Sequence, residues 1–139
     1  MGPYRASTWD DIEANIQRAR TVAIAAWQMG YAAFCPHMNT AHFDGLAPDD
    51  VWLLGDLEWV EVSDVGIVVP NIPGLTNWQD STGTRGEIQR CHDNLIPVYY
   101  YPDDEDLLRE DVWAPPRRQE GHAAHVYTSL VRSFPQFSG

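Results

Sequence analysis

The spacing of apolar residues predicts that helices and short strands alternate along this chain. Near the N-terminus, apolar residues recur at every third or fourth position, the spacing of one face of an α-helix: Ile12, Ile16, Ala19, Val22, Ala23 and Ala26. Ser7 or Thr8 can cap the start of this helix, and Gly30 can end it. The first element is therefore expected to be an amphipathic helix.

The same alternation continues toward the C-terminus. Short apolar runs predict strands at 31–35, 65–69 and 95–101. Amphipathic stretches predict helices at 48–63, from near residue 84 onward, at 103–110 and at 122–134. The connecting segments are expected at 36–46, 70–80 and 112–119. Such an alternation of helices and strands is typical of an α/β domain with a parallel sheet.

The composition fits one compact domain over residues 1–139, since 44% of the chain is hydrophobic and 12% is aromatic. No apolar run approaches the ~20 residues that span a bilayer. The N-terminus also lacks the basic and apolar regions of a signal peptide. Two cysteines, Cys35 and Cys91, are too few for a disulfide framework. We therefore expect a cytoplasmic protein with reduced thiols and no membrane partner.

The formal charge of −11 limits the partners of the protein. Acidic residues concentrate at 49–64 and 103–111. Such a surface repels the phosphate backbone of a nucleic acid. A polymeric nucleic acid is therefore not expected as a partner, whereas a local pocket can still hold a single nucleotide.

The segment from Asp80 to Glu87 is the main candidate for chemistry. It follows the predicted strand at 65–69, contains small and hydroxyl residues, and opens a predicted helix. Backbone N–H groups and the helix dipole favour an anion at such a place. We expect Glu87 in the first turn of the helix, held ionised. The alternative is a capping box, in which Glu87 returns to the backbone of Thr84.

Asp56 is the second candidate carboxyl group. On a helix it shares a face with Trp52 and Trp59, so partial burial can raise its pKa. Two carboxyl groups with separated pKa values can cleave a glycosidic bond, one as nucleophile and one as proton donor. The alternative is an exposed acid on an amphipathic helix.

No cofactor is expected. The histidines and cysteines between residues 35 and 92 do not have the spacing of a closed zinc site.

The order of several short motifs resembles the nucleoside 2-deoxyribosyltransferase-like superfamily. The motifs are GPYR, FCPHMNT, FDG, DDVWLLGDLEW, SDVGIVVP, DSTGTRGE and IPVYYY, and they lie within residues 2–101. The chain is most similar to a small bacterial and phage branch, related to the deoxynucleoside 5′-monophosphate N-hydrolases. This resemblance implies a doubly wound parallel sheet in a three-layer, flavodoxin-like or Rossmann-like arrangement. It also implies a homo-oligomer that acts on a nucleoside or nucleotide.

The resemblance also implies roles for individual residues. Glu87 matches the glutamate that attacks the anomeric carbon, and Asp56 matches the proton donor to the departing base. Tyr4 is placed to orient the nucleophile or the sugar. The residues expected to bind substrate are Arg5, Asn39, His42, Asp44, Asp80, Ser81 and Gly83. Among them, Ser81 and Arg5 match positions that hold a 5′-phosphate. For Arg5, an ion pair with Asp10 or Asp11 is the alternative. Asn39, His42 and Asp44 are included because they lie in the predicted loop that would cover a base, and ordinary polarity of a loop is the alternative for them.

One feature departs from the pattern of the superfamily. Relatives carry an apolar strand before the GPYR motif, and this chain begins Met1-Gly2-Pro3. The first, central strand is therefore expected to be missing or truncated. The leading interpretation is an N-glycosidase of nucleosides or their 5′-monophosphates. A deoxyribosyltransferase, a non-catalytic nucleotide-binding module and an enzyme cleaving a dinucleotide such as NAD are the alternatives.

Overall fold

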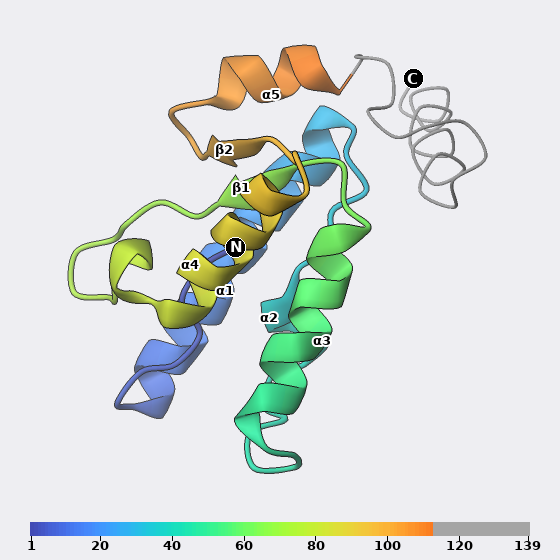
Figure 1. Cartoon of the computed structure of the whole chain (residues 1–139). Coiled ribbons are helices and arrows are strands. Elements are labelled where there is room, and N and C mark those ends of the chain that lie inside the picture. The colour runs from blue at the N-terminus through green and yellow to red at the C-terminus, as the bar shows by residue number, and fades with distance from the viewer. Residues whose placement is uncertain (113–139) are drawn as a thin grey trace.

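The computed structural model describes residues 1–112, which form helices around a small parallel sheet (Figure 1). The helices are α1 (Trp9–Met29), α2 (Pro36–Asn39), α3 (Asp49–Glu61), α4 (Thr82–Asp93) and α5 (Glu105–Asp111), with a 3₁₀ turn η1 (Trp78–Asp80). The strands are β1 (Gly66–Val68) and β2 (Val98–Tyr100). The prediction of a mixed α/β fold with a parallel sheet is confirmed at this level. The helix predicted at 122–134 lies outside the described residues.

β1 is hydrogen-bonded along both of its edges. On one edge it pairs in parallel with β2, with Gly66 opposite Val98. On the other edge, the Met1 amino group donates to Ile67 O at 2.6 Å, and Val69 N–H donates to Met1 O at 3.0 Å. This is the bonding pattern of a parallel neighbour. Met1 thus lies where the sequence analysis expected the first strand to be missing or truncated.

The strand predicted at 31–35 is not formed. Within the described residues, the backbone hydrogen bonds of this segment go to helices: Tyr31 N–H donates to Ala26 O, and Cys35 O accepts from Met38 and Asn39. A strand needs a hydrogen-bonded neighbour, and the apolar run alone does not supply one. Cys35 is instead the N-cap of α2, so the predicted loop at 36–46 begins with a short helix.

α1 forms as the apolar pattern predicts. Thr8 Oγ1 accepts from Asp11 N–H at 3.1 Å and caps the start of the helix. Gly30 ends it in the left-handed conformation, with φ of 103°. The buried face of α1 packs on the sheet, where Ala19 and Val22 form a cluster with Val69. This cluster therefore joins α1 to the segment at the end of β1.

The other predicted elements form with shifted ends. β2 starts later than predicted, because Leu95 adopts φ of 57° and Ile96 N–H donates to Cys91 O at 2.8 Å, which closes the end of α4. α4 starts earlier than predicted, with Ser81 as its N-cap. None of the helices within residues 1–112 is long and apolar enough to cross a membrane.

The close approach of the N-terminal segment to β1 makes a prediction for Gly2. A Cβ atom on Gly2 would lie 2.5 Å from Cγ2 of Val69, which is buried. We expect Gly2→Ala to lower the free energy of unfolding by about 1–3 kcal/mol, measured by urea titration. Gly86→Ala is the control, because a Cβ on Gly86 meets nothing within 4 Å and alanine favours a helix. Equal stability of the two variants would contradict this packing.

Candidate active site

A cavity of about 420 Å³ lies where several segments meet. Its walls come from residues 2–5, from α2 and the loop after it, from α3, and from the start of α4 with the loop before it. The structure brings most of the predicted site residues to this cavity: Tyr4, Arg5, Asp44, Asp56, Asp80, Ser81, Gly83 and Glu87. It does not bring Asn39 or His42 there.

The start of α4 forms one end of the cavity. Ser81 Oγ accepts from Thr84 N–H at 3.2 Å and from Thr84 Oγ1 at 2.9 Å, so Ser81 is the N-cap. The capping-box alternative for Thr84 and Glu87 is therefore wrong. Within the described residues, the N–H groups of Thr82 and Gly83 have no hydrogen-bond acceptor, and both residues line the cavity. These groups offer donors to an anion.

Glu87 is buried in the second turn of α4, where 9% of the residue is exposed. Burial raises the pKa of Glu87 to about 7; the positive charge of the Met1 amino group opposes this shift, and the charge of Asp56 adds to it. The expectation that Glu87 is held ionised in the first turn is therefore wrong. The effect of a helix N-terminus fades within one turn, and desolvation then dominates.

Asp56 faces the same cavity from α3 and is half-buried. Burial raises the pKa of Asp56, and the Met1 amino group opposes the shift. The direction agrees with the sequence analysis, which expected partial desolvation on this helix face. Asp56 is also one of the causes of the raised pKa of Glu87, so the two carboxyl groups interact across the cavity.

Tyr4 is bound to the loop after α2. Its hydroxyl donates to Asp44 Oδ1 at 2.7 Å and accepts from His42 N–H at 3.1 Å. Burial, together with the bond to Asp44, raises the pKa of Tyr4. The hydroxyl is thus directed at Asp44, and no hydrogen bond joins it to Glu87 within the described residues. The role expected for Tyr4 in orienting the nucleophile is not seen in this arrangement.

Arg5 lies at the mouth of the cavity and forms an ion pair with Asp49 of α3. The alternative partners Asp10 and Asp11 are therefore wrong, because the N-terminal segment brings Arg5 to α3. Both side chains are about 60% exposed (62% for Arg5 and 60% for Asp49), so the pair adds little stability. A phosphate at this place would have to compete with Asp49 for the guanidinium.

The two residues left outside the cavity lie on the surface. The ring of His42 is exposed and lies 3.1 Å from Glu13 of α1 (Nε2 to Oε2). Asn39 is exposed at the last position of α2. The prediction of a loop holds for His42 and is wrong for Asn39, which belongs to α2. Nothing in the spacing of these polar residues specifies which side chains turn inward.

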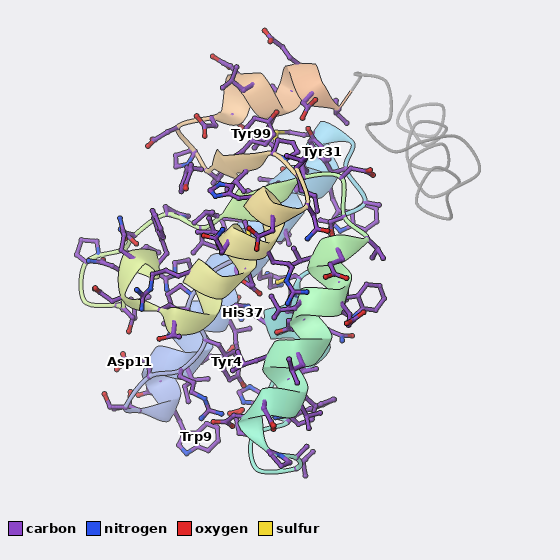
Figure 2. The ribbon with its side chains drawn as sticks, in the orientation of Figure 1. Tyr4, Trp9, Asp11, Tyr31, His37 and Tyr99 are labelled. Atoms are coloured by element: carbon purple, nitrogen blue, oxygen red, sulfur yellow. The ribbon has the colours of Figure 1, made fainter. Side chains whose placement is uncertain are left out.

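His37 is a cavity residue that the sequence analysis did not select. Burial lowers its pKa to about 4, with its bond to Pro3 O opposing the shift, so the imidazole is neutral near pH 7. Its Nε2 lies 2.8 Å from Pro3 O, which requires a proton on Nε2. The edge of its ring meets Tyr4, with ring centroids 5.5 Å apart, and Figure 2 shows both side chains between α1 and α3.

Trp52 is a second residue that the sequence analysis did not select, although it lies on the same face of α3 as Asp56. Its indole N–H is buried and has no hydrogen-bond acceptor in the described part of the chain. Its ring meets Phe43 edge-on, with centroids 6.0 Å apart, and both residues line the cavity. The two rings form an aromatic wall of the cavity, and the indole N–H is buried without an acceptor among residues 1–112.

Comparison with protein-family models, curated proteins and solved structures gave no match. Within residues 1–112, no group of three or more His, Cys, Asp or Glu side chains is arranged to hold a metal ion. The chemistry of the site is therefore argued from its own residues. These are one buried and one half-buried carboxyl group, two N–H groups at the start of α4 that have no acceptor within the described residues, and an aromatic wall.

The buried carboxyl group makes a prediction for stability. The pKa of Glu87 rises from 4.5 to about 7 on folding, so the folded state keeps its proton where the unfolded state loses it. Glu87 therefore makes its full contribution to the free energy of unfolding below pH 4.5. This contribution falls as the pH rises toward about 7, and the total loss is roughly 3 kcal/mol at most. We expect Glu87→Gln to abolish this loss, measured by urea unfolding between pH 4 and pH 8.

The contribution of His37 has the opposite sign, because its pKa is lowered on folding. The contribution of His37 is the same in the parent and in Glu87→Gln, so it cancels when their pH profiles are subtracted. Glu110→Gln, at an exposed position of α5, controls for removal of one negative charge. Parallel pH profiles for the parent and Glu87→Gln would contradict the burial of this carboxyl group.

Proposed function

We propose that this protein is an N-glycosidase that cleaves the base–sugar bond of a nucleoside or nucleoside 5′-monophosphate. The observation that carries the proposal is the carboxyl pair: Asp56 from α3 and Glu87 from α4 face one cavity, and burial raises the pKa of both. Raised pKa values let such a pair keep one proton near neutral pH while the other group is ionised. Glycosidic cleavage needs this state.

The proposed reaction assigns one step to each carboxyl group. The Glu87 carboxylate attacks the anomeric carbon, the carbon–nitrogen bond breaks, and the proton on Asp56 passes to the departing base. Water then attacks the glycosyl ester, gives one proton to Asp56, and releases the free sugar and the Glu87 carboxylate. The sequence resemblance supports this assignment of roles. The pKa of about 7 for Glu87 means that a proton must leave this group before it attacks.

The rest of the cavity supports a nucleoside-sized ligand. A volume of about 420 Å³ lies in the range of small-molecule sites, ~300–1,000 Å³. We assign the base to the wall formed by Trp52 and Phe43, where it can pack against the aromatic rings. We assign a 5′-phosphate to Ser81 and the free N–H groups of Thr82 and Gly83.

The proposal also includes the architecture and the oligomeric state that the resemblance to the superfamily implies, and the cellular location expected from the sequence. We propose that the parallel pair of strands, with Met1 beside β1, is part of a doubly wound, three-layer domain in which Met1 marks the central strand. We also propose a cytoplasmic homo-oligomer. Exposed apolar residues of α3 and its C-cap support the oligomer, since about half of each is accessible: Val51, Leu54, Trp59 and Val62.

Two other functions use the same cavity. A deoxyribosyltransferase would pass the sugar to a second base instead of water. A nucleotide-binding module would hold the ligand without cleaving it. Two observations favour the binding module: burial raises the pKa of Glu87 to about 7, and the Tyr4 hydroxyl donates to Asp44.

The proposal predicts release of free base, measured by chromatography after incubation with ribo- and deoxyribonucleosides and their 5′-monophosphates. We expect Glu87→Gln to lower the rate by at least roughly 10³-fold, because a neutral amide does not attack the sugar. Glu110→Gln should retain the parent rate. No release of base by the parent, with or without an acceptor base, would leave the binding module as the better account.

The roles of the two carboxyl groups can be separated with a deoxyriboside whose leaving group, such as p-nitrophenolate, departs without a proton. We expect Asp56→Asn to lose ~10²–10⁴-fold on nucleosides and to approach the parent rate on this substrate. Glu87→Gln should remain inactive on both. Recovery by Glu87→Gln instead would assign Glu87 as the acid and Asp56 as the nucleophile.

A further inference from the structure

Two polar residues of α1 are buried although the proposed reaction does not use them. Asn15 is 1% exposed and Arg18 is 4% exposed. Within the described residues, no carboxylate pairs with the Arg18 guanidinium, and its Nε has no hydrogen-bond partner. Burial of a charge without a counter-charge destabilises a fold. Apolar residues at these positions of the helix would fill the core without that cost.

The hydrogen bonds of this pair reach two walls of the cavity. Arg18 Nη1 donates to Thr76 O at 3.1 Å and, more weakly, to Pro70 O at 3.4 Å. Arg18 Nη2 donates to Asn15 Oδ1 at 2.8 Å. Asn15 Nδ2 in turn donates to Tyr4 O at 3.1 Å. One chain of hydrogen bonds therefore joins the N-terminal segment to the loop after β1.

The loop held by Arg18 leads directly to the start of α4, where the proposal places a 5′-phosphate. Asn71 closes the loop on itself, since its Nδ2 donates to Gln79 Oε1 at 2.7 Å and its Oδ1 accepts from Trp78 N–H at 2.9 Å. Ser81 N–H donates to Trp78 O at 3.2 Å, which fixes the N-cap to the same unit. Holding Pro70 and Thr76 thus sets the position of Ser81.

We propose that Arg18 and Asn15 are positioning residues, which hold the start of α4 and the N-terminal segment at a fixed separation across the cavity. The guanidinium suits this task because it can donate several hydrogen bonds in one plane and stays charged when buried. The effect on ligand affinity rests on the proposed function, whereas the effect on the loop does not.

Hydrogen exchange measured by mass spectrometry tests the loop. We expect Arg18→Met to speed amide exchange about tenfold in residues 70–81 and to leave α3 and β2 near the parent rates. Arg18→Lys keeps the positive charge but lacks the two donating nitrogens of the guanidinium, so it should give an intermediate rate of amide exchange. Equal acceleration throughout the domain, or none in the loop, would overturn the proposal. If Arg18→Met fails to fold, Arg18→Lys and Asn15→Leu provide the comparison.

Ligand affinity tests whether Arg18 affects the proposed phosphate site at Ser81. Binding of a nucleoside and of its 5′-monophosphate is measured by calorimetry in the Glu87→Gln background, where turnover is blocked. We expect Arg18→Met to weaken the monophosphate about tenfold more than the nucleoside, because only the phosphate contacts Ser81. Asn15→Leu should weaken both equally, through Tyr4. An unchanged preference in Arg18→Met would overturn the link. Failure of the base-release experiment does not affect the hydrogen-exchange measurement, which needs no ligand.

Discussion

The hydrogen bonds along both edges of β1 hold the candidate site together. One edge pairs with β2, and the other pairs with Met1 in the parallel direction. Two segments therefore leave the sheet at the carboxyl end of their strands, residues 2–5 and residues 70–81. Ligands of open parallel sheets bind at this end. These segments form facing walls of the cavity, and α4 starts where the second segment ends.

Burial, more than charge pairing, governs the chemistry of this cavity. It raises the pKa of Glu87 to about 7 and lowers that of His37 to about 4, so both groups tend toward their neutral forms. The indole N–H of Trp52 is buried without an acceptor. Such groups lower the stability of a fold, and they are typical of sites where a ligand supplies the missing contacts.

The order of helices and strands could be predicted from the sequence because periodicity is a local property. The apolar spacing in α1, its cap at Thr8 and its end at Gly30 were all readable. The strand at 31–35 was wrong because strand formation depends on a neighbour that a local pattern does not contain. The cap of α4 was displaced to Ser81 because several hydroxyl residues in succession offer equivalent local choices.

The sequence by itself determined most of the helices and strands, and that the carboxyl groups of Glu87 and Asp56 are carried by helices. Only the tertiary structure decided that burial raises the pKa of Glu87, that Arg5 pairs with Asp49, and that Arg18 is buried without a counter-charge. The physical reason is the difference in range between the two kinds of interaction. Helix and strand periodicity arise from neighbours along the chain, whereas desolvation and charge pairing depend on every group that folding brings close in space.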